Sequence, residues 1–203
     1  MNALTLRDDL FSALHQKSLK PLQYKKKGHW STREVDDVVH SFYLRASRFG
    51  SKEEAVFWID VQVFSKRWHE LLFKPLPYTG PTEGKPSLLS ESLGRMATPP
   101  IAASIKITSP KAAAALEIQL ITAADQQALP LLATCTSYEG LLTYLGRQPE
   151  STERFLASAG LLRLLQQDAK ARDAVAKAKS LVSHENELKW LEVREWALWQ
   201  RAA

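Results

Sequence analysis

Two neighbouring segments of the chain alternate between apolar and other side chains over nine or ten residues. They span residues 38–46 and 55–64. Core-type side chains stand at every second position: Val38, Phe42 and Leu44 in the first, and Phe57, Ile59 and Val61 in the second. A period of two is typical of half-buried β-strands. Because only residues 47–54 separate the segments, the sequence predicts antiparallel neighbours in one sheet.

Further strands and helices are expected on either side of this pair. Residues 28–33 predict a strand before it, and alternating isoleucines predict another at 101–107. Thr5 is expected to cap a first helix that stops near Pro21. The alanine-rich residues 111–128 predict a helix. A strand is the alternative there, because apolar residues also alternate at Leu116, Ile118 and Leu120.

The composition changes twice along the chain. Proline and glycine recur without periodicity over residues 76–100, which predicts an irregular loop. After residue 150 proline is absent and glycine occurs only at Gly160, which predicts two or three helices. The expected fold class is α+β, with an antiparallel sheet of three to four strands and packed helices. We expect an α+β domain over residues 1–150, with C-terminal helices over 151–203 packed on the same domain.

Charge and hydropathy narrow the class of partner. The 203 residues carry a net charge of +5, and residues 1–50 hold nine Lys/Arg against five Asp/Glu. This favours a partner with an acidic surface or a phosphate. The apolar runs are shorter than the roughly 18 residues that a membrane span needs. The N-terminus lacks the pattern of a secretory signal, so a cytoplasmic location without membrane contact is expected.

The residues that carry common chemistry do not form a known motif. The one cysteine, Cys135, excludes an intramolecular disulfide and is expected to be buried as an apolar residue. His69-Glu70 begins like the zinc-protease helix motif, but Phe73 stands where the second histidine is needed. The histidines show no ligand spacing, and no Walker loop, GxGxxG or GxSxG occurs. The sequence therefore predicts no catalytic residue, no metal and no cofactor.

A basic and aromatic cluster is the strongest candidate for a functional surface. Tyr43, Arg45 and Trp58 fall on the strand face opposite the core-type residues. Such a mixture suits protein interfaces and single-stranded nucleic acid. Two other interpretations stay open: helices cover that face, or the lysines only solvate a turn. The candidate partner-binding residues are Lys25, Lys26, Lys27, Arg33, Tyr43, Arg45, Arg48 and Trp58.

Residues 19–30, which read Leu-Lys-Pro-Leu-Gln-Tyr-Lys-Lys-Lys-Gly-His-Trp, resemble the opening of the bacterial family called domain of unknown function 4304. Later segments at 44–50, 57–61, 129–132 and 141–145 also resemble it, and the similarity covers about residues 5–147. The chain departs from the family pattern at Gln23, where glycine is expected, and at Ala46, where glutamine is common. The resemblance implies no reaction, because the family has no assigned catalytic residues.

These observations support three hypotheses of function. The first is a non-enzymatic bacterial binding protein. Its concrete form is an immunity-type protein that binds and inhibits a cognate toxin, by analogy of size and style. The alternative is a nucleic-acid-binding protein that uses the basic patch from Lys25 to Arg48. The third is an enzyme whose groups, such as His40, Asp60 and Glu70, meet only in the fold.

Overall fold

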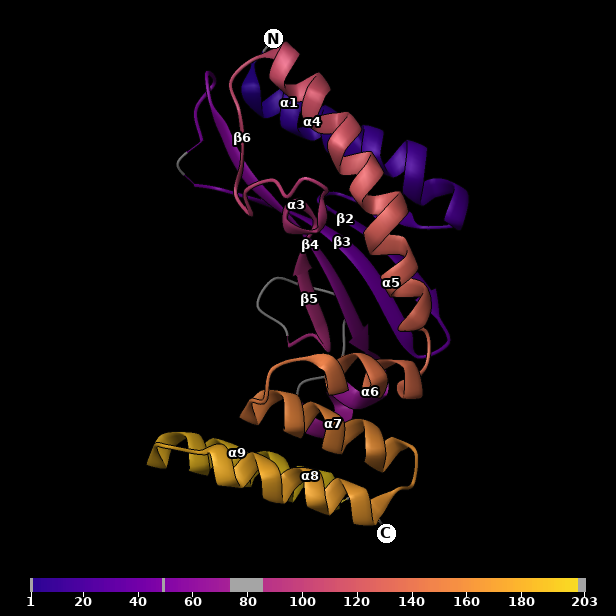
Figure 1. Ribbon diagram of the computed structural model, residues 1–203, viewed down its shortest axis with the longest axis vertical. Helices are drawn as coiled ribbons and strands as arrows, with labels where there is room; N and C mark the ends of the chain where they lie inside the picture. The colour runs from indigo at the N-terminus through magenta and orange to yellow at the C-terminus, as the bar shows by residue number, and fades with distance from the viewer. Residues whose placement is uncertain (1, 49, 74–85, 201–203) are drawn as a thin grey trace. The chain divides into compact units, whose positions relative to one another are not determined.

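Figure 1 shows the computed structural model of the chain, which describes residues 2–48, 50–73 and 86–200. Helices and an antiparallel sheet are both present, so the expected α+β class is confirmed. In the described part of the chain no helix is both long and apolar enough to cross a membrane.

The chain divides into two compact units. Unit 1 comprises Met1–Val63 and Leu89–Ala133, and unit 2 comprises Phe64–Leu88 and Thr134–Ala203. Unit 2 therefore interrupts unit 1 in sequence. The expected division at residue 150 stays a prediction.

Unit 1 is built on a sheet in which the pairs β1–β2, β2–β3, β4–β5 and β4–β6 are antiparallel. The strand order is β1-β2-β3-β4-β5, and β6 also pairs with β4. The register joins Trp30 to Tyr43 and Asp60 to Ser92. The strands are β1 (Lys25–Lys27), β2 (Trp30–Val35), β3 (Val38–Ala46), β4 (Ala55–Ser65), β5 (Leu89–Ser92) and β6 (Ile105–Ile107).

Unit 1 also contains four α-helices and three short π- or 3₁₀-helical turns among its described residues. Figure 1 shows α1 and α4 side by side, and both also contact β6. The elements are α1 (Ala3–Leu14), the π-helical turn η1 (His15–Leu19), the 3₁₀ turn η2 (Lys20–Leu22), α3 (Leu93–Met96), α4 (Pro110–Ala123), the π-helical turn η3 (Ala124–Ala128) and α5 (Leu129–Thr134).

One face of the sheet, here the helix-side face, forms the core of unit 1. Phe57, Ile59 and Val61 of β4 are fully buried on it. His15 of η1 meets Ser31 of β2 on this face, with 2.8 Å between Nδ1 and Oγ. Burying each large apolar side chain contributes roughly 1.5–3 kcal/mol. The alternation seen in the sequence therefore decides which side of the sheet the helices cover.

Local signals place the helix ends of unit 1, with one correction. Asn2 caps α1 by accepting a hydrogen bond from the Leu4 amide at 2.7 Å, so the expected cap at Thr5 is wrong. An Asn side chain can cap a helix as well as a Thr side chain can, and Asn2 directly precedes α1, whereas Thr5 lies inside it. Ser109 caps α4 with Pro110 in its first turn, which confirms the helical interpretation of residues 111–128.

The sheet has more strands than expected. Six strands are described where three to four were predicted. β1 occupies the lysine run, and Gly28 adopts a left-handed φ of 58° in the turn that follows it. β5 and α3 lie within residues 86–100, where the prediction of an irregular loop is wrong. The rest of that predicted loop, residues 76–85, lies outside the described residues.

Unit 2 is mainly helical. Its helices are α2 (Lys66–Phe73), α6 (Tyr138–Arg147), α7 (Thr152–Leu164), α8 (Asp168–Leu181) and α9 (Glu185–Trp199). The central helix α7 contacts α2, α6, α8 and α9. At Gly160 of α7 an added Cβ would lie 2.7 Å from the Trp68 ring of α2. The missing side chain thus allows the two helices to approach closely.

Candidate functional site

The outer face of the sheet, defined here by Trp30, Tyr43, Arg45 and Trp58, holds most of the predicted binding residues. Directly opposite residues share a face, and Trp30 lies opposite both Tyr43 and Lys27. Arg45 contacts Trp58 of β4, which places both side chains on this same face. The sheet therefore brings together side chains from β1, β2, β3 and β4.

Trp30 and Tyr43 form one aromatic pair of the outer face. Their ring centroids lie 4.1 Å apart with an interplanar angle of 12°, so the rings are stacked. Trp30 is half-buried, whereas Tyr43 is 9% exposed. Sequence reasoning did not include Trp30 in the site. The missing information is the register between β2 and β3, which the sequence does not contain.

Arg45 and Trp58 form the second pair of the outer face. The Arg45 guanidinium lies 4.6 Å from the Trp58 ring centroid. Its Nε also donates a hydrogen bond to Asp60 Oδ2 at 3.1 Å. The side chain of Arg45 remains 41% exposed, whereas that of Asp60 is 14% exposed. The arginine is thus held in one orientation by two contacts and still meets solvent.

The three lysines of β1 do not act as one group. All three are exposed. Lys25 and Lys27 belong to the outer face, because they lie opposite Thr32 and Trp30. Lys26 belongs to the helix-side face. Its Nζ lies 5.7 Å from the Phe11 ring centroid and 3.2 Å from the Ser12 hydroxyl of α1.

Two predicted arginines lie away from the outer-face pairs. Arg33, one of the candidate binding residues, lies opposite His40 on the helix-side face and not beside Tyr43. The reason is parity: residue 33 is an odd number of positions from Trp30 along β2. Arg48 is exposed after the end of β3. His40 itself is 2% exposed, in agreement with a buried strand histidine.

Ionisable groups near this sheet respond to burial. Desolvation lowers the pKa of His15, and the positive charges of Lys26 and Lys20 lower it further. Desolvation also raises the pKa of Tyr24 well above its usual value, an effect that Arg33 partly opposes. The Tyr24 ring lies edge-on against Phe42 at 5.8 Å. Both groups are therefore uncharged members of the core near neutral pH.

Two residues with side chains suited to catalysis or metal binding, His69 and Cys135, are buried in the fold. His69 is 4% exposed and its ring stacks on Phe73 with 5.3 Å between centroids. Cys135 is fully buried, and desolvation raises the pKa of its thiol. Within the described ranges no group of three His, Cys, Asp or Glu side chains is arranged to hold a metal ion.

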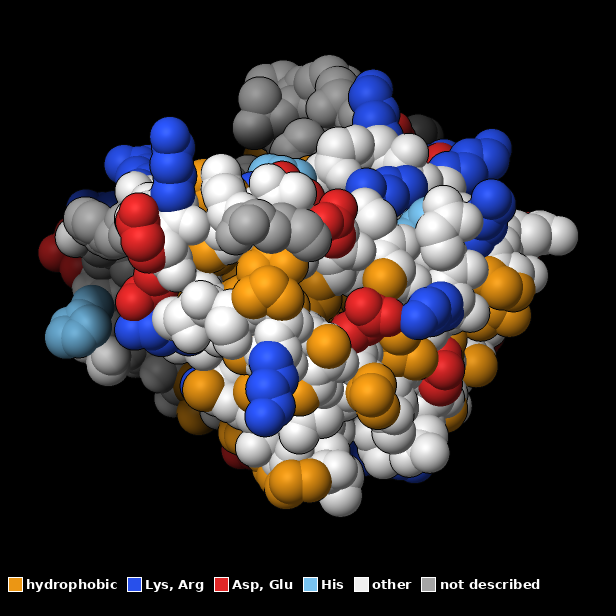
Figure 2. Space-filling view, turned by 90° about the horizontal axis from the view of Figure 1, so that it is seen from above, with side chains coloured by type: hydrophobic (Ala, Val, Ile, Leu, Met, Phe, Trp, Pro, Cys, Tyr) orange, Lys and Arg blue, Asp and Glu red, His pale blue; other side chains and the backbone are white. Residues whose placement is uncertain are grey.

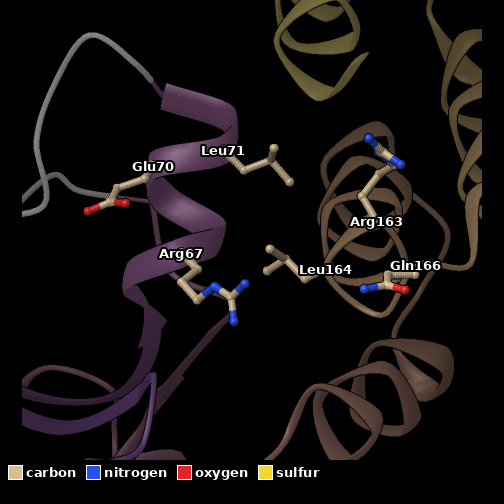
Figure 3. Close-up of a pocket in the computed structure, with 6 residues that line it drawn as sticks. All are labelled: Arg67, Glu70, Leu71, Arg163, Leu164 and Gln166. Atoms are coloured by element: carbon tan, nitrogen blue, oxygen red, sulfur yellow. The ribbon is translucent and has the colours of Figure 1, made fainter. Parts of the chain in front are cut away.

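A pocket of about 350 Å³ lies between α2 and α7 of unit 2 (Figure 3). Figure 3 shows Leu71 and Leu164 pointing toward each other, while Glu70 points away from them. Arg163 already has partners: it pairs with Asp168, and its Nε donates to the Leu198 carbonyl at 3.3 Å. This guanidinium holds α7 to its neighbours, so the outer face of the sheet remains the stronger site.

The surface at the N-terminal end of Figure 1 carries mixed charge. Figure 2 shows Lys and Arg side chains interspersed with Asp and Glu over this end. Two ion pairs of unit 1, Lys17–Glu117 and Lys106–Glu54, each join atoms 2.6 Å apart. These pairs neutralise part of the local charge. The outer face also has an ion pair, Arg45–Asp60, and differs in the stacked rings of Trp30 and Tyr43 beside it.

Comparison with known proteins identifies a family. The model of a family described as Domain of unknown function (DUF4304) matches residues 15–134. The match includes all described strands and more than half of the chain. No curated protein and no solved structure matches. The resemblance noted from the lysine-rich segment is confirmed, and the chain belongs to the DUF4304 family.

Proposed function

We propose that the protein works by binding another protein through the outer face of its sheet. The observation that carries this proposal is the pair of contacts Trp30–Tyr43 and Arg45–Trp58. Trp, Tyr and Arg are the residues that most often dominate binding energy in protein interfaces. Because these side chains already contact one another, little side-chain entropy remains to be lost on binding.

Charge supports a partner with an acidic surface. Lys25 and Lys27 are exposed on the same face as the aromatic pairs. Arg45 shares its charge with Asp60, whereas the lysines add two positive charges at the edge of the sheet. Opposite charge on a partner accelerates association and selects its orientation.

An immunity-type protein that binds and inhibits a cognate toxin is the concrete form of this proposal. The support is analogy: immunity proteins are small α+β proteins that act by occupying a partner surface. The test is co-expression with the product of the gene directly upstream, followed by measurement of growth and of binding by calorimetry. Rescue of growth and a stable complex are expected. Full growth inhibition with no complex would rule out that pairing.

Matched variants test whether the outer face is the binding surface. Trp58→Ala and Arg45→Gln should each weaken the complex at least tenfold, because each removes part of a preorganised contact. The controls are Trp196→Ala and Arg147→Gln, which change exposed residues of α9 and α6. Controls that bind like the wild type support the proposal. Equal losses in both sets, or none in either, would assign binding elsewhere.

Nucleic acid is a second candidate partner, favoured by the position of Lys27 opposite Trp30. An aromatic ring beside lysines on a sheet suits single-stranded nucleic acid. Binding of a short single-stranded oligonucleotide should then fall steeply with salt. Lys25→Glu combined with Lys27→Glu should reduce the salt slope. Weak binding that does not depend on salt would exclude this candidate.

A further inference from the structure

A second pocket of unit 2 has the character of a small-molecule site. It has a volume of about 490 Å³ and lies among α2, α7 and α9. This volume falls within the roughly 300–1,000 Å³ of typical ligand pockets. Most of the wall is apolar or aromatic, and it includes Trp68, Leu72, Phe73, Leu156 and Trp190.

The aromatic wall is held in place by its own contacts. Trp68 Nε1 donates a hydrogen bond to the Ala157 carbonyl at 3.2 Å, and its ring lies 5.4 Å from that of Phe73. Trp68 is 4% exposed, whereas Trp190 keeps 37% of its surface exposed. A flat apolar group that covered Trp190 would therefore remove additional apolar area from water.

Arg194 supplies the principal positive charge of this pocket. Its Nη1 donates to the Leu72 carbonyl at 2.7 Å, and its guanidinium lies 4.3 Å from the Phe73 ring centroid. Its Nε is buried, with no hydrogen-bond partner in the described part of the chain. Desolvation also lowers the pKa of Arg194. An anion therefore stabilises a guanidinium in these surroundings more than it would stabilise a guanidinium in water.

Glu153 limits the negative charge that a ligand of this pocket can carry. It lines the pocket and is exposed in the first turn of α7. Its negative charge repels a ligand that carries several anionic groups. The pocket therefore favours a single negative charge that pairs with Arg194 and stays away from Glu153.

We infer that this pocket binds a small aromatic monocarboxylic acid. The ring lies against Trp68, Phe73 and Trp190, and the carboxylate accepts hydrogen bonds from Arg194. Arginine is suited to this role because its planar donors match a carboxylate. This inference is independent of the proposed function, because every residue that it uses belongs to unit 2.

The test compares acids with their neutral isosteres on the full chain. Phenylacetate is paired with phenylacetamide, and indole-3-acetate with indole-3-acetamide, and calorimetry measures each affinity. At least one acid should bind with a Kd below about 1 mM, and its amide at least tenfold more weakly. Failure of both acids to bind at this level, or equal binding of acid and amide, would overturn the inference.

Two variants locate the charge that matters. Arg194→Gln should weaken the acid at least tenfold and leave the amide nearly unchanged. Glu153→Gln should leave the acid as tight as before or tighter. The Glu153→Gln variant retains the hydrogen bond from Arg194 to the Leu72 carbonyl, so it remains informative if Arg194→Gln fails to fold. A folded Arg194→Gln that binds the acid like the wild type, or a weaker acid complex in Glu153→Gln, would overturn the inference.

Discussion

Two serines on neighbouring strands show how the same side chain can differ in its contribution to stability. Ser31 and Ser41 are both fully buried. The Ser31 hydroxyl has the His15 ring as a partner at 2.8 Å. The Ser41 hydroxyl has no partner among the described residues. A buried polar group stabilises the fold only when it is hydrogen-bonded, so the two positions should respond differently to alanine.

Ser31→Ala should lower the free energy of unfolding by about 1–3 kcal/mol, because it leaves the His15 nitrogen without its partner. Ser41→Ala should change it by less than about 0.5 kcal/mol or raise it, because the lost hydroxyl had no partner. Urea unfolding of both variants measures the difference. Equal destabilisation would show that the Ser41 hydroxyl is satisfied after all.

His15 should make the stability depend on pH. Its pKa in the folded protein is lowered from 6.5, so the unfolded chain takes up a proton that the folded protein does not. The free energy of unfolding should therefore fall as pH drops below about 6.5 and level off below the lowered pKa, with a slope of up to about 1.4 kcal/mol per pH unit. The groups that face His15 are Lys26, Lys20 and the Ser31 hydroxyl. Urea unfolding at pH 7.5 and 5.5 should show a smaller difference in His15→Gln than in the wild type.

At the scale of elements, the sequence predicted long and buried strands more accurately than short and polar ones. β3 and β4 are long, and their alternation predicted them correctly; β4 buries one face, whereas β3 is buried on both faces from Val38 to Leu44. β1 and β5 are short and mainly polar, and they form because a neighbouring strand offers hydrogen bonds. The site followed the same pattern. Tyr43, Arg45 and Trp58 were placed on one face by parity, whereas the contribution of Trp30 required the register.

Helix packing in unit 2 gives a matched pair of glycines. Gly160→Ala should destabilise the protein by about 1–3 kcal/mol, because the new Cβ would lie 2.7 Å from the Trp68 ring. Gly146 lies in α6, where an added Cβ would meet nothing within 4 Å. Gly146→Ala should therefore stabilise by up to about 1 kcal/mol through helix propensity. Thermal unfolding of both variants is the measurement, and a neutral Gly160→Ala would contradict the close contact.

At the scale of the whole molecule, the net charge of +5 affects the rate of association with a charged partner. If an acidic protein binds the outer face, long-range attraction should raise the association rate constant. Raising the ionic strength from 0.02 to 0.5 M should lower that constant by about tenfold and change the dissociation rate constant much less. Stopped-flow mixing separates the two rates. An association rate that is insensitive to salt would argue against a partner of opposite charge.

The insertion of Phe64–Leu88 into the sequence of unit 1 has a practical consequence. The family match ends at residue 134, yet α2 within it buries Trp68 and Leu72 and contacts α7 and α9, which come later in the chain. A fragment that ends at residue 134 would lack α7 and α9. It would therefore expose these apolar side chains of α2 and tend to aggregate. The residues that the family model matches therefore lack helices against which α2 packs, and expression trials should extend the chain through α9.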